Sequence, residues 1–332
     1  HARGCLHPAS LRTTPTAARV RSPFVPPGRA GVHVRGRARA SVRDWCEIMK
    51  LDASVAAAFG PTSLFVLLWS SGALFAKWGL AHAGTFVFLS LRFGLALAVL
   101  SLLALTRGHW LPRREVRRVA LTGALLVGGY SVFYLLALDL GLTPGLLATL
   151  LGVQPIATLL LTERPLRRSR LAGLALALAG LVVLVLESLL AARVSAAGLL
   201  AAFASLACMT AGTLLQKRLD QAPLEVMPLQ YAVALAMCVL LLPLWPVRVE
   251  WGAGLALSVL WLGLVISVAA TLLLYRLLQH GNVVNVTSLF YLVPAGTAVL
   301  DWMVFGNVMA PLAIVGAAGI LVGVMLVHRD GP

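Results

Sequence analysis

From Ser54 onward the chain alternates long apolar runs with short polar breaks, a pattern that predicts helices crossing a membrane. A hydrocarbon core about 30 Å thick requires about 20 apolar residues for each spanning helix. We expect ten spans, near residues 58–77, 84–106, 117–138, 143–162, 170–190, 195–216, 224–246, 252–275, 282–305 and 309–328. The expected fold class is therefore an all-α integral membrane protein with ten transmembrane helices.

Composition agrees with this pattern, because 60% of the residues are hydrophobic and only 12% are charged. Soluble domains carry about 25% charged residues. The net charge of +15 raises the question of nucleic acid, but the basic residues lie mainly in the first fifty residues and in short loops between apolar runs. Such clusters are typical of membrane topology and of contact with anionic lipid. We expect the lipid bilayer as a partner and no nucleic acid.

The loops also predict an orientation. With the amino terminus inside, 13 Lys and Arg residues fall in inner loops and the carboxyl terminus, against three in outer loops, which are Lys77, Arg193 and Arg248. The positive-inside rule then places both termini in the cytoplasm. The composition, rich in Ala, Leu and Arg, suggests a bacterial inner membrane.

Residues 1–48 differ from the rest, since they are basic, contain no acidic residue before Asp44 and lack the apolar region of a secretory signal. Three interpretations are open: residues upstream of a true start at Met49, an organellar transit peptide, or a basic tail on anionic lipid. In each case we expect residues 1–48 to be disordered.

Several residues recur at a nearly constant spacing, which predicts an internal repeat. The matching sets are Gly72 and Lys77 with Gly212 and Lys217, Tyr130 and Tyr134 with Thr271 and Tyr275, Thr149 and Pro155 with Ser288 and Pro294, and Gly173 and Gly180 with Gly316 and Gly323, at offsets of 140, 141, 139 and 143. A unit of five spans is odd, so the second copy enters the membrane from the opposite side. We expect two inverted five-helix repeats, at residues 54–190 and 195–328, an architecture of many secondary transporters.

The motifs that carry a family resemblance run from "LLWSSGALFAKWGL" and "FLSLRFGLALAVL" through "GLTPGLLATLLGVQPIATLLLTERPLRRSRLAGLALALAGLVVLV" to "NVTSLFYLVPAGTAVLDWMVFGN" and "GAAGILVGVML". In this order the chain resembles the drug/metabolite transporter superfamily, in the ten-helix form built from two EamA domains. The resemblance covers about residues 58–328. It implies alternating access by a transporter of amino acids, their derivatives or other small metabolites.

Two charged residues stand inside predicted spans. Arg92 lies about 12 Å from the outer end of the second span, and the family pattern also places an arginine there. It either faces a wet cavity and attracts an anionic or zwitterionic substrate, or ties neighbouring helices through their carbonyls. Asp301, in the ninth span, is a candidate for pairing with Arg92 or for proton coupling. The alternative is an interfacial aspartate on a helix that ends early at Gly306.

Pro155 and Pro294 sit at repeat-related positions inside the fourth and ninth spans, where each removes a backbone hydrogen bond. Paired helix breaks point to a transporter's binding site, although a kink that serves packing alone is the alternative. Nearby polar residues, Gln154, Asn285 and Ser288, are candidates for the cavity lining.

A polar and aromatic lining is expected from three further spans. Tyr130 and Tyr134 share one face of the third span, as Ser267, Thr271 and Tyr275 do in the eighth, and Trp69 and Ser70 lie in the middle of the first. Hydrogen bonding between helices is the alternative role. The small residues Gly173, Ala177, Gly319 and Gly323 suit close packing, or a homodimer through the fifth and tenth helices.

The sequence favours a secondary transporter that exports a small-molecule substrate. It contains no H-E-x-x-H, G-x-S-x-G or Walker motif, so we expect neither an enzyme nor a cofactor. The four cysteines have no metal spacing, and no metal site is expected. A channel and a non-transporting membrane regulatory protein are the alternatives, disfavoured because neither explains paired breaks in a repeat.

Overall fold

A computed structural model describes residues 42–108, 110–190, 195–306 and 310–329. Residues 1–50 and 51–332 form separate units, and the expected tail falls largely outside the described residues. Within the described part the chain is helical and contains no strand, only an isolated bridge between Ala83 and Val249. The helices are α1 (Val42–His82), α2 (Thr85–Thr106), α3 (Val116–Gly123), α4 (Tyr130–Asp139), α5 (Pro144–Leu151), α6 (Gln154–Thr162), α7 (Arg168–Leu184), α8 (Leu186–Leu190), α9 (Ala196–Lys217), α10 (Pro223–Leu241), α11 (Ala253–Leu260), α12 (Thr271–His280), α13 (Val283–Ser288), α14 (Leu292–Phe305) and α15 (Pro311–Arg329).

Nine of the ten expected spans are present in the described residues, with changes at their ends. Nine segments of the described chain are long and apolar enough to cross a membrane: 60–82, 85–106, 113–139, 144–162, 196–217, 223–244, 253–280, 283–300 and 311–329. The expected fifth span, 170–190, is divided at Val185 into α7 and α8. Because α7 has 17 residues, it is about 26 Å long at 1.5 Å per residue, slightly shorter than a hydrocarbon core.

The first helix begins earlier than expected. We placed residues 42–48 in a disordered tail, but α1 starts at Val42. No glycine or proline occurs between Arg37 and Phe59, so nothing in this stretch interrupts helical backbone.

Two spans change helix type at their centres. Residues 124–129 form a π-helical segment between α3 and α4, and residues 261–270 form another between α11 and α12. The α-helix resumes at Tyr130 and Thr271, the pair that the sequence repeat relates. π-helical turns are rare and widen the helix locally.

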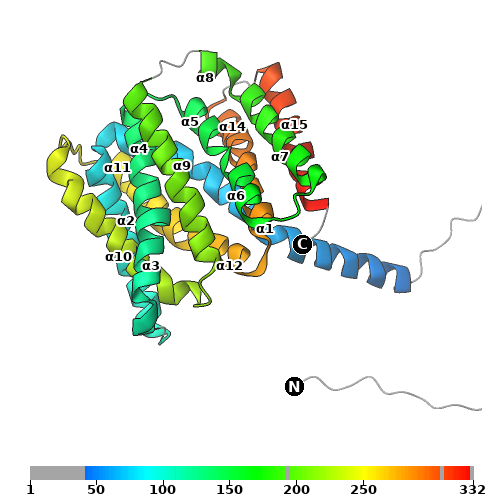
Figure 1. The fold of residues 1–332 in the computed structure, drawn as a ribbon, viewed down its shortest axis with the longest axis horizontal. Coiled ribbons are helices and arrows are strands. Elements are labelled where there is room, and N and C mark those ends of the chain that lie inside the picture. Colours follow the sequence, from blue (N-terminus) through cyan, green and yellow to red (C-terminus); the bar gives the residue numbers. More distant parts are fainter. Residues whose placement is uncertain (1–41, 109, 191–194, 307–309, 330–332) are drawn as a thin grey trace, which may run out of the picture. The chain divides into compact units, whose positions relative to one another are not determined.

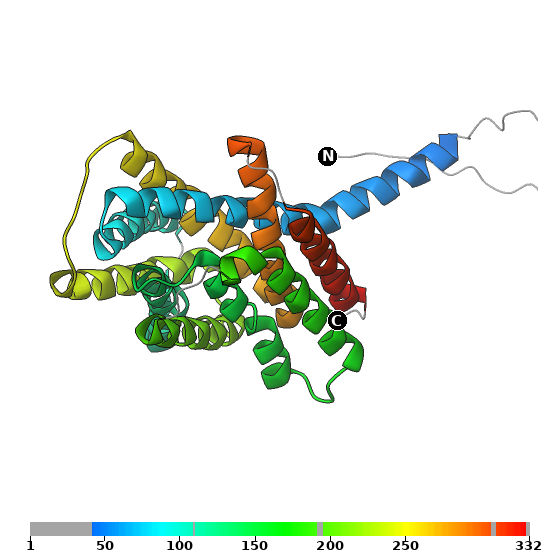
Figure 2. The same ribbon diagram turned by 90° about the horizontal axis from the view of Figure 1, so that it is seen from above.

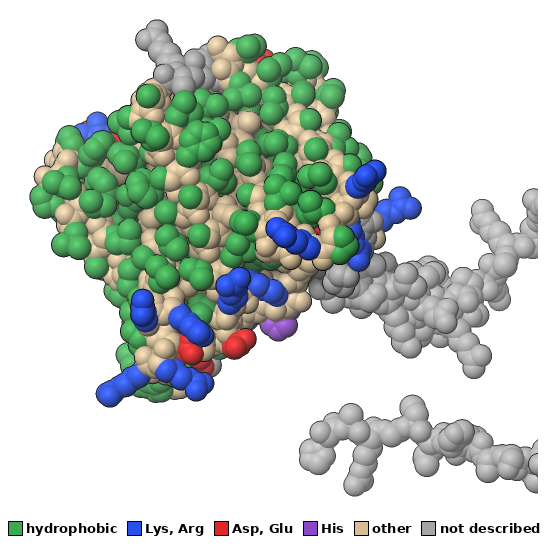
Figure 3. Space-filling view, in the orientation of Figure 1, with side chains coloured by type: hydrophobic (Ala, Val, Ile, Leu, Met, Phe, Trp, Pro, Cys, Tyr) green, Lys and Arg blue, Asp and Glu red, His purple; other side chains and the backbone are tan. Residues whose placement is uncertain are grey.

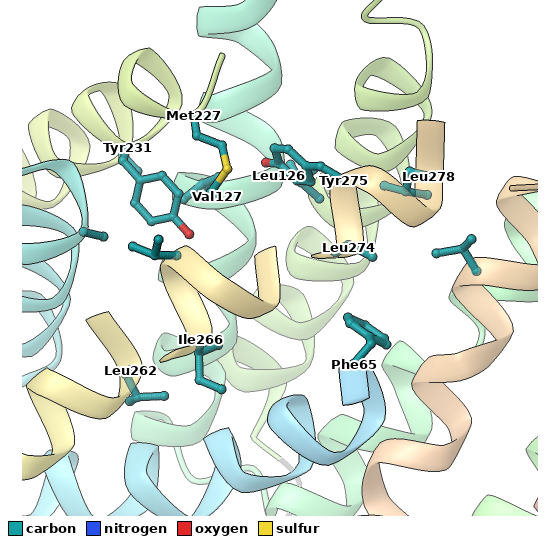
Figure 4. Packing of buried hydrophobic residues seen from close by; sticks show 14 of the residues in the cluster. Phe65, Leu126, Val127, Met227, Tyr231, Leu262, Ile266, Leu274, Tyr275 and Leu278 are labelled. Carbon is teal, nitrogen blue, oxygen red and sulfur yellow. The ribbon is translucent and has the colours of Figure 1, made fainter. Parts of the chain in front are cut away.

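The helices of residues 51–332 pack in pairs that are distant in sequence (Figures 1 and 2). Helix α7 runs beside α15, α2 beside α10, and α4 beside α9. Their buried side chains form a core that includes Phe65, Tyr231, Ile266 and Tyr275 (Figure 4). In Figure 3, hydrophobic side chains cover most of the visible surface, and most Lys and Arg side chains gather along its lower and right edges. We use the name basic end for the span ends that carry residues 113–118, 164–170, 217–218 and 276. Lys217 Nζ donates there to the carbonyls of Gln279 and Gly281, and Asn282 Nδ2 donates to Glu163 Oε1.

The end opposite the basic end is held together by loop contacts. The Gly84 amide donates to the Arg248 carbonyl at 2.8 Å, and the Glu250 amide donates to the His82 carbonyl at 2.7 Å. Gly84 has no room for a side chain, because a Cβ there would lie 2.7 Å from the Pro246 carbonyl oxygen. These contacts join the loop after α1 to the loop before α11.

Candidate functional site

A cavity of about 170 Å³ lies among the spans that contain the helix breaks. Its lining comes from α1, α2, α4, α7, α9, the junction of α5 and α6, the π-helical segment of residues 261–270, and residues 290–294. A smaller cavity of about 50 Å³ shares part of this lining and reaches Thr213, Thr271 and Tyr275. The residues that line both cavities are Trp69, Arg92, Tyr130, Ser131, Met209 and Phe290. The two cavities therefore share one wall and form a single candidate site.

Arg92 is the cation in this wall. Its Nε donates to Ser267 Oγ at 2.9 Å, which anchors the guanidinium to the π-helical segment of residues 261–270. No carboxylate in the described part of the chain lies within ion-pair distance of Arg92. Its guanidinium carbon is also 5.5 Å from the Phe93 ring centroid. Arg92 thus lines both cavities and also contacts a second span, through the Ser267 hydroxyl and not through the backbone carbonyls that we expected as the alternative. Its role toward a substrate stays a prediction.

Tyr130 and Tyr134 lie on the wall formed by α4. Their ring centroids are 5.8 Å apart, as one helical turn predicts. Both line the larger cavity, and neither hydroxyl has a hydrogen-bond partner in the described residues. The site thus offers two tyrosine hydroxyls that form no hydrogen bond with the described residues, although the Tyr134 ring packs against the core.

An aromatic cluster contributes Trp69 and Phe290 to the lining. Trp69 of α1 packs edge-on against Phe290 with ring centroids 5.4 Å apart, and Phe65 lies 5.1 Å from Trp69 and 5.4 Å from Phe290. Because edge-to-face packing fixes the ring positions, this cluster provides a rigid apolar surface. The structure places the Phe290 ring in the cavity lining. In the sequence, Phe290 is one apolar residue among many.

The two helix breaks meet at the cavity. The fourth span is interrupted at Gly152 and Val153, just before Pro155, and the ninth at residues 289–291, just before Pro294. Both prolines line the larger cavity. Tyr291 Oη donates to the Gly152 carbonyl oxygen at 2.5 Å, so one interrupted span is bonded to the other.

Four expected lining residues lie outside both cavities. Ser70 donates to the Val293 carbonyl at 3.1 Å, and Ser288 donates to the Asn285 carbonyl at 2.7 Å. Gln154 is fully buried, with Nε2 3.5 Å from Thr213 Oγ1. The Asn285 amide donates to Oδ1 of Asn282, the residue that caps the start of α13. Ser70 and Gln154 thus contact neighbouring helices. Ser288 bonds within its own helix, and Asn285 Oδ1 is buried without a hydrogen-bond partner in the described residues.

A buried network that we did not predict borders the smaller cavity. Tyr275 Oη donates to Gln230 Oε1 at 2.7 Å, and Gln230 Nε2 donates to Gln216 Oε1 at 2.8 Å. Tyr231 Oη donates to the Ser267 carbonyl at 2.7 Å and lies 3.3 Å from Thr271 Oγ1. In the sequence, Gln216 and Gln230 are the features that could have predicted this network, because polar side chains inside apolar spans require hydrogen-bond partners.

Asp301 belongs to the backbone of α14, but its side chain lies outside the described residues. Its relation to Arg92 therefore stays a prediction.

The small residues of the expected homodimer contact pack within one chain. A Cβ on Gly180 would lie 2.7 Å from the Gly316 carbonyl oxygen, and one on Gly323 would lie 2.5 Å from the Ala177 amide nitrogen. They bring α7 and α15 together, so this glycine surface is already covered. A homodimer stays a prediction.

Comparisons with known proteins agree with this arrangement. Residues 196–329 match the model of the EamA-like transporter family. Among 29 matching chains of solved structures is one titled "Crystal structure of protein", 23% identical, with a TM-score of 0.67 over 82% of this chain and 98% of that chain. No curated protein matches significantly in sequence. The solved structure shows a shared fold, and the family match shows that residues 196–329 are similar to the EamA-like transporter family.

Proposed function

We propose that this protein is a secondary transporter that exports small metabolites by alternating access. The observation that carries the proposal is a cavity with one cation, Arg92, where two interrupted spans meet. Broken helices at the centre of a membrane bundle are a usual way to build a transported-solute site. The EamA-like domain supports the same class of function.

Three structural correspondences support an inverted repeat of residues 54–190 and 195–328. The π-helical segments are followed by α-helix at Tyr130 and Thr271, at the offset of 141 found in the sequence. The breaks before Pro155 and Pro294 occur at corresponding places. The third correspondence is that Gly173 meets Gly323 while Gly180 meets Gly316. Such reciprocal contacts are what a two-fold axis between the repeats would produce.

Alternating access requires contacts between the halves that can open at either end. At the basic end, Asn282 Nδ2 donates to Glu163 Oε1 at 3.2 Å, and Glu163 also pairs with Arg170. At the opposite end, Trp245 Nε1 donates to Asp139 Oδ2 at 3.0 Å. Both contacts are polar and lie near the ends of spans, so they are suited to exchange with water when one end opens.

Topology and energy coupling complete the proposal. The basic end would face the cytoplasm with both termini, in a bacterial inner membrane. Asp301, in α14, would bind the proton that drives exchange. A homodimer, if it forms, would use the outer surfaces of α7 and α15.

The test compares the media of cells that express the full chain, its Arg92→Gln variant or an empty vector, at equal membrane abundance. We expect at least one small metabolite to accumulate outside only with the intact protein. Equal media from all three strains would contradict export. Accumulation that is the same with the variant would retain transport and remove Arg92 from the site.

A further inference from the structure

Arg92 is the charged side chain in the described cavity lining, and most of its hydrogen-bond donors have no partner in the described residues. An arginine side chain carries five N–H donors, and the described structure gives Arg92 one hydrogen bond, from Nε to Ser267 Oγ at 2.9 Å. The Ser267 contact fixes the guanidinium plane and leaves the two terminal nitrogens without protein acceptors in the described part of the chain. This orientation is the one in which a guanidinium can hold a carboxylate through two parallel hydrogen bonds.

Charge points to the same ligand class. A cation inside a membrane span is costly without a counter-charge. The described residues that line the two cavities include no aspartate or glutamate. An anionic solute would supply the missing negative charge, whereas a cationic solute would add a second positive charge to the same cavity.

The remaining walls suit an apolar body attached to that anion. Trp69 and Phe290 form a fixed aromatic surface, with centroids 5.4 Å apart. Tyr130 and Tyr134 present rings on another side, and their unpartnered hydroxyls can donate to a second acceptor. Apolar residues such as Met209 and Leu262 complete the lining.

We propose, on the basis of the transport function above, that the site takes an amphipathic organic monoanion. Its carboxylate binds the terminal nitrogens of Arg92, and its apolar body packs between the Trp69–Phe290 surface and the Tyr130–Tyr134 pair. An α-ammonium group on the same solute has no carboxylate partner in the described lining. A simple carboxylate is therefore favoured over the α-amino acid with the same body, and the corresponding amine is disfavoured most.

Three probes with one body and different charge test this order. They are 3-phenylpropionate (an anion), phenylalanine (a zwitterion) and phenethylamine (a cation). Binding to the purified full chain is measured by calorimetry, and transport is measured separately as uptake into proteoliposomes. We expect affinity to fall in that order, and Arg92→Gln to weaken 3-phenylpropionate binding by about 10- to 100-fold. Arg92→Lys keeps the positive charge but removes the paired terminal nitrogens of the guanidinium, so it should retain part of the affinity for 3-phenylpropionate.

Lys77→Gln is the matched control, because it also removes one positive charge from a span but from an exposed side chain that lines neither cavity. It should leave 3-phenylpropionate affinity unchanged. The comparison of the three probes on the unmodified chain needs no variant. It therefore tests the preference for an anion even if Arg92→Gln does not fold.

The outcomes separate the ligand class from the transport function. Equal or tighter binding of phenethylamine, absence of binding by all three probes, or an undiminished affinity in folded Arg92→Gln would overturn the ligand class. Transport of phenethylamine or of phenylalanine in preference to 3-phenylpropionate would overturn it while transport stands. Binding of 3-phenylpropionate without any uptake would leave the anion site in place and contradict the proposed function.

Discussion

Gly173 and Gly323 bring two helix backbones into direct contact. A Cβ on Gly173 would lie 2.9 Å from the Gly323 carbonyl oxygen, closer than real Cβ atoms approach other atoms. Gly180 and Gly316 stand in the same relation seven residues along each helix, at 2.7 Å. Because lipid competes equally for apolar side chains, close backbone approach is a main source of helix association in membranes. The crossing of α7 and α15 therefore depends on residues without side chains.

Gly180→Ala should destabilise the protein, because its methyl group meets the backbone of α15 and not a movable side chain. We expect a loss of about 1–3 kcal/mol in the free energy of unfolding, measured by denaturation in detergent micelles. Gly94→Ala in α2 is the matched control, since nothing lies within 4 Å of a Cβ there. An equal effect of the two substitutions would show that helix packing at Gly180 is not the cause.

Tyr291→Phe should weaken the connection between the two interrupted spans. The hydroxyl that it removes donates to the Gly152 carbonyl oxygen at 2.5 Å, and one such bond contributes about 0.5–1.5 kcal/mol to stability. Tyr134→Phe removes a hydroxyl without a partner and should leave unfolding unchanged. Thermal unfolding of both variants tests this difference, and equal stabilities would argue against the Tyr291 bond.

The buried chain from Tyr275 through Gln230 to Gln216 should behave as one unit. Gln230→Leu leaves a buried tyrosine hydroxyl and a buried amide without partners, at a cost of about 1–3 kcal/mol. Adding Tyr275→Phe should restore part of this stability, because the orphaned hydroxyl is then absent. Strictly additive free energies in the double-mutant cycle would contradict the network.

The proposed orientation is open to chemical labelling. In a background without native cysteines, Arg248→Cys should react with a membrane-impermeant maleimide in intact cells, because its loop would lie outside. Arg114→Cys should react only after permeabilisation; its parent side chain is 84% exposed, so access is not limited by burial. Labelling in the reverse order would place the basic end outside the cytoplasm.

Much of the fold could be predicted from the sequence, since spans longer than 18 apolar residues are a strong signal. The sequence also singles out Pro155, Pro294 and Arg92, because each breaks a rule of ordinary spanning helices. The structure places all three in the lining of the larger cavity, and their role in transport stays a prediction. The division of the fifth span at Val185 was not found, since no glycine or proline marks it.

Which polar residues face the cavity was harder to predict. In a helix bundle within lipid, the lipid-facing and the inward-facing sides of a helix are both apolar. The pattern of apolar and polar residues therefore does not show whether Ser70 or Gln154 faces the cavity or a neighbouring helix. The eighth span contains a π-helical segment, which closes hydrogen bonds five residues apart, yet Thr271 and Tyr275 both line the smaller cavity together with Arg92. Thr271 Oγ1 donates to the Ile266 carbonyl at 3.0 Å. Ser267 contacts Arg92, whereas Tyr275, which we placed on the same face, contacts Gln230.

Counterflow in proteoliposomes is the most direct test of alternating access through this cavity. Vesicles containing the full chain are preloaded with the solute that it exports, and entry of labelled solute is followed. We predict that preloading accelerates entry and that Arg92→Gln abolishes the acceleration. Entry that proceeds equally in empty and preloaded vesicles, at a rate that does not saturate with solute, would indicate a channel and contradict alternating access.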